Sequence, residues 1–167
     1  MKNNFLIGIP TFNEEASILD VLKRIKSFIS KNNKSDCNFS VVFYDDGSTD
    51  NTVQSIKENS NFNVIVGKTN KGLGHAMKNL FLYAKEKDVD GLIKLDGDGQ
   101  MDPQEIPLFV KKFKDDSSDV IYGNRFFANS DYKMPLTRKL GSRFFRLFFS
   151  ILGLKVKDPT NGFIFVS

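Results

Sequence analysis

A short apolar run, Leu92–Leu95, leads directly into two carboxylates separated by one glycine, Asp96 and Asp98, and then into Gln100. Side chains two residues apart point to the same side of an extended chain, so both carboxylates can converge on one cation where the strand ends. Carboxylate and amide oxygens suit hard divalent ions such as Mg²⁺ or Mn²⁺, which in turn hold substrate phosphates. The pattern indicates an enzyme that handles a phosphate-bearing compound through a metal ion, although a plain Asp/Gly surface turn has the same composition.

The composition is that of one soluble domain. The chain has 167 residues, of which 40% are hydrophobic and 26% are charged, as expected for a single hydrophobic core. Its one cysteine, Cys37, cannot form an internal disulfide, and its one histidine, His75, excludes a histidine-rich metal site. No apolar run reaches the roughly 18 residues of a membrane span, and residues 1–4 lead into a predicted strand rather than a signal peptide.

The positive charge is concentrated in one segment. Residues 133–157 contain seven of the 24 basic residues and no Asp or Glu. The rest of the chain is left with 17 basic residues against 20 acidic ones, so the formal net charge of +4 comes from a basic segment on a slightly acidic body. This distribution excludes a general nucleic-acid-binding surface and favours a single basic patch.

Apolar runs alternate with helical patterns along the chain. Five runs predict strands: Phe5–Ile9, Phe39–Tyr44, Asn63–Val66, Gly91–Leu95 and Val120–Gly123. Four segments predict helices: one from about Glu14, one capped by Thr49 or Asp50, one opened by Gly72-Leu73-Gly74 and one from about Pro103 to Lys114. Strands that alternate with helices predict an α/β fold with a mainly parallel sheet covered by helices on both faces.

Polar clusters follow four of the predicted strands. They are Pro10–Glu14, Asp45–Ser48, Asp96–Asp98 and Asn124-Arg125. Because ligands of open parallel sheets bind beyond the carboxyl ends of the strands, these clusters are expected to meet at one edge. Neither a Gly-rich dinucleotide motif nor a P-loop lysine motif is present in the sequence.

Six segments together resemble glycosyltransferase family 2, whose members have the GT-A fold, in the branch of dolichyl-phosphate mannose synthase and bacterial polyprenyl-phosphate glycosyltransferases. The segments are Ile9–Glu14, Asp45–Asp50, Asn70–Ala76, Asp96–Gln100, Gly123–Phe126 and Asp158–Phe163. They occur in family order across nearly the whole chain, which makes the resemblance specific. It implies a nucleotide-sugar glycosyltransferase with one Rossmann-like GT-A domain over residues 1–167.

The resemblance implies that residues in or near these segments bind the nucleotide-diphosphate sugar. They are Pro10, Phe12, Glu14, Phe43, Asp45, Asp96, Gly97 and Asp98. Asp45 is expected to reach the base or the ribose, and both UDP- and GDP-linked donors fit. Relatives usually have Tyr where this chain has Phe12, so stacking on the base is kept but a hydroxyl contact is lost.

The resemblance also assigns the acidic segment to metal binding. Asp96 and Asp98 form the family's DXD motif, and Gln100 joins them as a ligand of Mg²⁺ or Mn²⁺. The family inverts the anomeric centre by direct displacement, and Asp98, Arg125 and Asp158 are the implied catalytic residues. Arg125 is expected near the donor or acceptor phosphate, whereas Asp158 is the candidate general base for a hydroxyl acceptor. A phosphate acceptor is largely ionised near pH 7, and Asp158 then has only an orienting role.

The basic segment carries apolar residues at helical spacing over Gly141–Leu154. Lys139, Arg143 and Arg146 lie near one another on a different face of this predicted helix. The pattern fits an ordinary core-facing helix or an interfacial helix that receives a lipid phosphate. The resemblance favours the second. It implies a polyprenyl-phosphate acceptor, contact of residues 133–157 with a membrane surface, and a cytoplasmic protein that is peripheral at the membrane face.

Three other functions remain open. The first is a glycosyltransferase that uses a saccharide hydroxyl acceptor in cell-surface polysaccharide synthesis. The second is a nucleotidyltransferase, which Pro10–Glu14 disfavours because this segment lacks a Gly-rich phosphate loop with a basic residue. The third is a nucleotide-sugar-binding fragment without activity, because the chain stops within a predicted strand at Ile164–Ser167, where relatives continue.

Overall fold

The computed structural model describes residues 2–32, 36–116, 118–123 and 162–167. In this part of the chain, six strands form one sheet in the order β3-β2-β1-β4-β6-β5. The strands are β1 (Asn3–Thr11), β2 (Cys37–Asp45), β3 (Asn63–Val66), β4 (Gly91–Lys94), β5 (Val120–Tyr122) and β6 (Ile164–Val166). β1 pairs in parallel with β2 and β4, and β2 pairs in parallel with β3, whereas β6 runs antiparallel to β4 and β5. The predicted mainly parallel sheet is confirmed.

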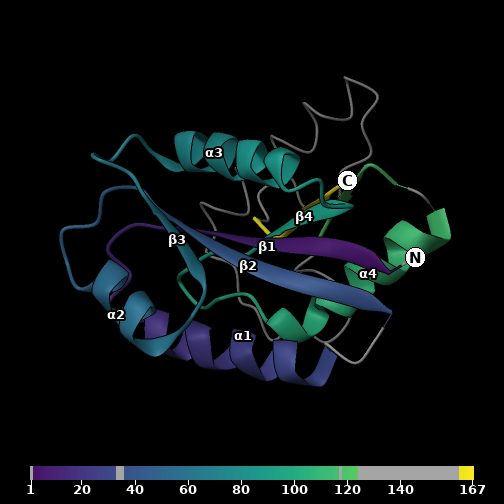
Figure 1. The fold of residues 1–167 in the computed structure, drawn as a ribbon, viewed down its shortest axis with the longest axis horizontal. Helices are drawn as coiled ribbons and strands as arrows, with labels where there is room; N and C mark the ends of the chain where they lie inside the picture. The colour runs from purple at the N-terminus through teal and green to yellow at the C-terminus, as the bar shows by residue number, and fades with distance from the viewer. Residues whose placement is uncertain (1, 33–35, 117, 124–161) are drawn as a thin grey trace, which may run out of the picture.

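Helices cover both faces of the sheet (Figure 1). One face carries α3 (Leu73–Glu86); the other carries α1 (Ile18–Asn32), α2 (Thr52–Asn59) and α4 (Ile106–Asp116), the last preceded by the 3₁₀ turn η1 (Pro103–Glu105). Successive side chains of β1 point to alternate faces of the sheet: Phe5 and Ile7 pack with α1, whereas Leu6 packs with α3. This double burial explains why the sequence of β1 is a continuous apolar run rather than an alternating one.

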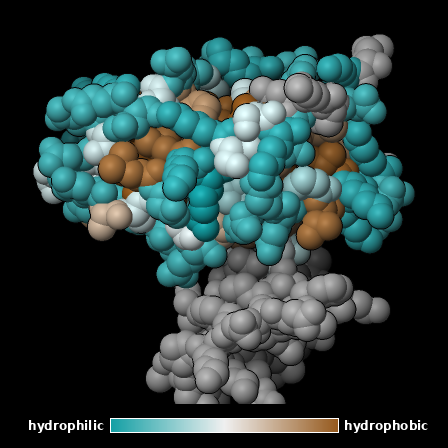
Figure 2. Space-filling view, turned by 90° about the horizontal axis from the view of Figure 1, so that it is seen from below, coloured by the Kyte–Doolittle hydropathy of each residue, from teal (hydrophilic) through white to brown (hydrophobic). Residues whose placement is uncertain are grey.

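The helices present polar surfaces to solvent. Five residues of α1 are buried: Ile18, Val21, Leu22, Ile25 and Phe28. Seen from below, the face that α1, α2 and α4 cover is mostly hydrophilic, with small hydrophobic areas between (Figure 2). The amphipathic pattern that predicted these helices therefore reflects one side packed on the sheet and one side in water.

The first helix begins later than predicted, at Ile18 rather than about Glu14. Asn13 has a left-handed backbone conformation (φ 53°), which Asn tolerates better than most residues. The chain then forms a turn in which the Glu14 carbonyl accepts hydrogen bonds from the N–H groups of Ser17 (3.0 Å) and Ile18 (2.9 Å). The Asn13 side chain accepts a hydrogen bond from the Thr49 N–H (2.8 Å). This turn therefore joins the loop after β1 to the loop after β2.

The second helix begins at Thr52. Of the two predicted caps, Asp50 accepts a hydrogen bond from the Thr52 N–H (3.0 Å). The residue at the N-cap position itself is Asn51, and its side chain makes no capping hydrogen bond. Asp50 thus satisfies a helix donor from just outside the helix. Desolvation acts to raise the pKa of its carboxyl, but the hydrogen bonds that it accepts from Thr52 and Glu15 together outweigh this and lower the pKa.

Candidate active site

A cleft of about 250 Å³ lies at the carboxyl edge of the sheet, where β1, β2 and β4 end. Six residues predicted to bind the donor line it: Pro10, Phe12, Glu14, Asp96, Gly97 and Asp98. The lining is completed by Thr11, Asp46, Asn70, Gly72, Leu73 and Ala76. Three of the four predicted polar clusters thus meet at one edge, as expected for ligand sites of parallel sheets. The fourth, Asn124-Arg125, lies outside the described residues.

The loop after β1 supplies one wall of the cleft. Phe12 is 40% exposed, which leaves a flat aromatic surface open to a ligand. Glu14 Oε2 accepts a hydrogen bond from the Ser17 hydroxyl (2.7 Å), which also lies 2.9 Å from the Gly97 carbonyl oxygen. Ser17 therefore connects the loop after β1 to the acidic loop after β4.

The structure gives Phe43 and Asp45 other places than the cleft. Phe43 of β2 is completely buried on the face of the sheet that α1 and α2 cover, and its ring lies near that of Phe62, with centroids 6.2 Å apart. The Asp45 carboxylate is buried and accepts hydrogen bonds from the N–H groups of Gly47 (3.1 Å) and Ser48 (2.9 Å) and from the Ser48 hydroxyl. Its oxygens hold the turn after β2, and neither side chain lines the cleft. Their contacts with a nucleotide stay predictions.

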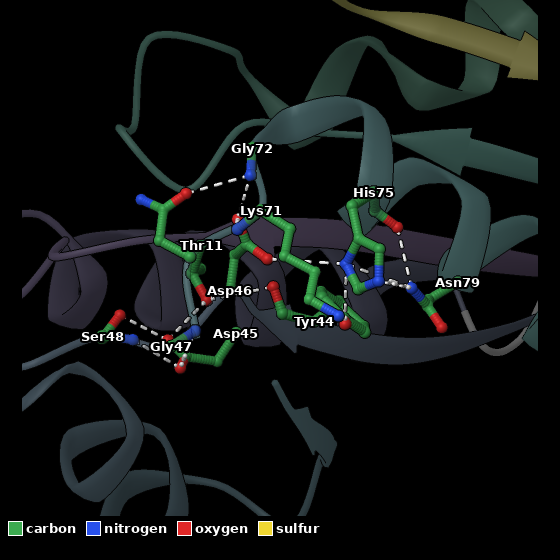
Figure 3. Close-up of polar contacts among 11 residues, drawn as sticks. Thr11, Tyr44, Asp45, Asp46, Gly47, Ser48, Lys71, Gly72, His75 and Asn79 are labelled. Atoms are coloured by element: carbon green, nitrogen blue, oxygen red, sulfur yellow. Dashed lines mark hydrogen bonds and ion pairs between the residues drawn. The ribbon is translucent and has the colours of Figure 1, made fainter. Parts of the chain in front are cut away.

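The neighbouring carboxylate, Asp46, lines the cleft instead, although the sequence reasoning did not select it. Asp46 Oδ2 accepts hydrogen bonds from the N–H groups of Lys71 (2.9 Å) and Gly72 (2.6 Å), at the start of α3 (Figure 3). Asp46 Oδ1 is buried and has no hydrogen-bond partner. The signal was present in the sequence: Asp45 heads an Asp-x-Gly-Ser turn, in which the first aspartate bonds the following backbone. The second aspartate is then available for contacts outside this turn.

Tyr44 and His75 pack behind Asp46 on the side of α3 (Figure 3). The Tyr44 hydroxyl lies 3.2 Å from His75 Nδ1, and this nitrogen lies 3.6 Å from Asp46 Oδ1, too far for a hydrogen bond. Burial raises the pKa of the Tyr44 hydroxyl, and the negative charges of Asp46 and Asp45 raise it further. Tyr44 therefore stays protonated at neutral pH and can donate a hydrogen bond to His75.

The acidic loop after β4 presents its two carboxylates differently. Asp96 forms an ion pair with Lys94, which is buried at the end of β4. Asp98 is exposed, and its Oδ1 accepts a hydrogen bond from the Gln100 N–H (2.9 Å). Asp98 and the side chain of Gln100 are thus open to solvent, whereas Asp96 has an internal partner.

Arg24 of α1 binds the backbone of the acidic loop after β4. Its Nη2 donates hydrogen bonds to the carbonyl oxygens of Gly99 and Met101 (2.9 Å to Met101). These carbonyls flank Gln100, so one guanidinium group fixes the backbone on both sides of a predicted metal ligand.

Asp98 and Gln100 are the residues of this loop that could hold a divalent cation. Within the described ranges, no group of three or more His, Cys, Asp or Glu side chains is placed to hold a metal ion. A site built on Asp98 and Gln100 would therefore take its remaining ligands from phosphates and water. Mg²⁺ is commonly bound in this way, by one or two carboxylates together with substrate phosphates.

The remaining predicted site residues lie outside the described residues. They are Arg125, Lys139, Arg143, Arg146 and Asp158. Their predicted roles stay predictions. The last two residues of the Asp158–Phe163 segment are described. Gly162 lies against Lys94 and Asp96, and Phe163 packs on Phe109 of α4 with ring centroids 4.4 Å apart.

The position of the cleft places the chain among α/β proteins that bind ligands at the carboxyl edge of a parallel sheet. The family model described as Glycosyl transferase family 2 matches residues 6–166. The chain therefore belongs to glycosyl transferase family 2, and the family expected from the sequence is confirmed.

Two curated relatives illustrate this family. The chain is 30% identical to the UDP-N-acetylglucosamine–dolichyl-phosphate N-acetylglucosaminyltransferase of Methanococcus voltae, over 92% of this chain and 65% of that protein. It is 27% identical to the undecaprenyl-phosphate mannosyltransferase of Micrococcus luteus, over 93% of this chain and 63% of that protein. The chain thus spans less than two thirds of the length of these relatives.

Solved structures support the fold. The structure is similar to glucosyl-3-phosphoglycerate synthase from Mycobacterium tuberculosis, solved with Mn²⁺, UDP and glucosyl-3-phosphoglycerate, with a TM-score of 0.72 and 18% identity. The match covers 99% of this chain and 57% of that chain. At this identity the comparison speaks for the fold alone, and the expected GT-A architecture is confirmed.

Substitution of the two adjacent carboxylates should affect the free energy of unfolding differently. Asp45→Ala should lower the free energy of unfolding by about 1–3 kcal/mol, because it leaves partly buried donors of the turn without an acceptor. Asp46→Asn should cause no such loss, because an amide oxygen can still accept the bonds from Lys71 and Gly72 while the buried charge is removed. Urea denaturation of both variants measures this, and equal losses would contradict the division of roles.

Proposed function

We propose that this chain is the donor-binding part of an inverting glycosyltransferase. It takes a sugar from a UDP- or GDP-linked donor with the help of Mg²⁺ or Mn²⁺ and transfers it to a polyprenyl phosphate. The observation that carries the proposal is one cleft, in a member of glycosyl transferase family 2, that combines an open aromatic ring, a buried carboxylate and an acidic loop.

The nucleoside is bound at the end of the cleft near Phe12 and Asp46. Phe12 offers its ring for stacking on the base. Asp46 Oδ1 is buried without a partner, and an unsatisfied buried acceptor is costly. Asp46 lines the cleft, so its carboxylate is the acceptor proposed to receive a hydrogen bond from the base or the ribose.

The diphosphate is bound at the acidic loop. Asp98 and Gln100 hold the cation, which, when bound, offsets the negative charge that grows on the leaving diphosphate as the glycosidic bond breaks. Among the described residues, the side chains that line the cleft include four carboxylates and neither Lys nor Arg. Without an added cation, this lining would repel an anionic donor.

The acceptor is proposed from the relatives and from the charge of the chain. Both relatives described above are named for a lipid phosphate, dolichyl or undecaprenyl. The second pKa of a phosphate is about 6, so the attacking oxygen is largely ionised near pH 7 and needs no general base. Asp158 then orients the acceptor, and Arg125, Lys139, Arg143 and Arg146 attract its phosphate.

We place the protein at the cytoplasmic face of the membrane, in contact through residues 133–157. A cluster of basic side chains is attracted to anionic lipid headgroups, and this attraction falls off within a Debye length of the surface. No helix in the described part of the chain is long and apolar enough to cross a bilayer.

A panel of nucleotides tests the donor site. UDP, GDP, CDP and ADP are each added with Mn²⁺ or with EDTA, and the melting temperature is recorded. We expect UDP or GDP to raise it only with Mn²⁺, because ligands that bind only the folded state stabilise it, by about 2.7 kcal/mol at 100 times Kd. A shift that persists in EDTA would refute the metal requirement, and no shift with any nucleotide would refute the donor site.

Asp98→Ala tests the metal ligand. We expect Mn²⁺-dependent nucleotide affinity, measured by calorimetry, to fall about tenfold or more, since one direct ligand is lost. The melting temperature should hardly change, because Asp98 is exposed. Asp115→Ala removes the same charge at an exposed position of α4 outside the cleft and serves as the control. If both variants bound the nucleotide equally, the metal assignment would be wrong.

A transfer assay tests the acceptor. The radiolabelled donor that the panel selects is incubated with undecaprenyl phosphate in detergent micelles or with a soluble oligosaccharide. We expect an organic-phase product that mild acid releases, as for a glycosyl phosphate. Label on the oligosaccharide alone would favour a hydroxyl acceptor, and nucleotide binding without transfer to either acceptor would favour a fragment that binds the donor only.

A further inference from the structure

Lys94, the last residue of β4, lies almost entirely inside the protein, with 4% of its surface exposed. Lysine is rarely buried to this degree unless its ammonium group is paired, because the charge loses its hydration. The other residues of β4 are glycine or apolar and are also buried. The single charge in this strand therefore calls for a specific partner.

That partner belongs to the proposed donor site. Lys94 Nζ forms an ion pair with Asp96 Oδ1. The two residues are two positions apart, so their side chains leave the chain on the same side where β4 ends. The side chain of Asp96 is 29% exposed and lines the cleft, whereas that of Lys94 is 5% exposed. The ammonium group thus lies behind the carboxylate as seen from the cleft.

The ion pair is enclosed by residues from distant parts of the chain. A Cβ atom at position 162 would contact Lys94 Nζ and would lie 2.6 Å from Asp96 Oδ2 and 3.1 Å from Met101 Cε. The Asp96 N–H also lies 3.4 Å from Met101 Sδ, within hydrogen-bond distance of sulfur. A side chain at position 162 would press on both members of the ion pair, so the glycine there lets the chain pass close to Lys94 and Asp96.

The charge of the cleft gives this arrangement a function. Four carboxylates line the cleft, and the nucleotide proposed to bind there is itself an anion. Lys94 supplies the positive charge that the lining lacks, and it does so from behind Asp96. Asp98, in contrast, has no cationic partner among the described residues, and only the Gln100 N–H contacts its carboxylate.

We infer that Lys94 is a positioning residue for the donor, which holds and neutralises Asp96 so that Asp98 is the carboxylate left for the cation. This inference rests on the proposed function. The two aspartates of the loop then have different roles: Asp96 is a fixed, charge-compensated part of the cleft floor, and Asp98 is the open ligand.

The variant Lys94→Met keeps the length of the side chain and removes its charge, and the inference predicts two effects of opposite sign. Mn²⁺ alone should bind about fivefold more tightly, because a nearby positive charge is lost and Asp96 is released. UDP or GDP at saturating Mn²⁺ should bind about fivefold more weakly, because the cleft becomes more negative toward an anion. Electron paramagnetic resonance measures the first affinity and calorimetry the second.

Lys112→Met is the matched control. Lys112 forms an ion pair with Asp116 on α4, and 57% of its side chain is exposed. The same substitution there removes the same charge and also breaks an ion pair, but outside the cleft, so both affinities should stay at the wild-type value. Lys94→Gln keeps a hydrogen-bond donor for Asp96 and serves as the second variant if Lys94→Met does not fold. It should likewise raise the affinity for Mn²⁺ and lower the affinity for the nucleotide.

A double variant links the effect to Asp96. If Lys94 acts through this carboxylate, Lys94→Met should strengthen Mn²⁺ binding much less in an Asp96→Asn background, where no carboxylate is released, than in the wild-type protein. Equal effects in both backgrounds would refute the link.

The outcomes separate this inference from the proposed function. If wild-type protein binds no Mn²⁺ and no nucleotide, the proposed function and the inference about Lys94 are both wrong. If it binds both, and the Lys94 variants match Lys112→Met, the inference alone is wrong. If both affinities fall together with the melting temperature in Lys94→Met and Lys94→Gln, the ion pair supports the fold rather than the donor, and the inference is again wrong.

Discussion

The parallel pairing of β1 with both of its neighbours is the constraint on which the site depends. β1 is aligned with β2 along its whole length, from Asn3 opposite Cys37 to Thr11 opposite Asp45, and with β4 from Phe5 opposite Gly91 to Gly8 opposite Lys94. In parallel pairs of this kind, the loops that follow the strands leave the sheet at the same edge. Phe12, Asp46 and the acidic loop come together because this alignment brings them to one edge.

Within that edge, acidic side chains occur in pairs with divided roles. Asp45 uses its oxygens to hold the turn after β2, whereas Asp46 keeps one buried oxygen without a partner. Asp96 has an internal cation, whereas Asp98 is exposed. In the first pair, the carboxylate of Asp45 fixes the turn that presents Asp46. In the second pair, the carboxylate of Asp96 is bound to the Lys94 side chain next to the open Asp98. A rigid support next to an unsatisfied group is the arrangement expected of a preorganised binding site.

The sequence predicted the strands, the parallel sheet and the meeting of its polar loops, because apolar runs and strand order are local or nearly local properties. It did not distinguish Asp45 from Asp46, since that choice depends on which side chain turns back to bond its own loop. Nor did it show that Ile164–Val166 lies between β4 and β5, which is a long-range pairing. The sequence did not predict the burial of Lys94 either, because a lysine at a strand end usually reaches solvent, whereas this one is covered by distant residues that include Gly162.

The contact of Gly162 with Lys94 and Asp96 also bears on the order in which the protein is assembled during synthesis. β1, β2 and β3 leave the ribosome early and carry the loops proposed to bind the nucleoside. The acidic loop follows, but its buried lysine is covered only when residues 162–166 have been made and β6 has paired with β4. Contacts between such distant segments form slowly, because a long loop must close first. A nascent chain that has not reached this point exposes an uncovered ion pair at the centre of its unfinished sheet.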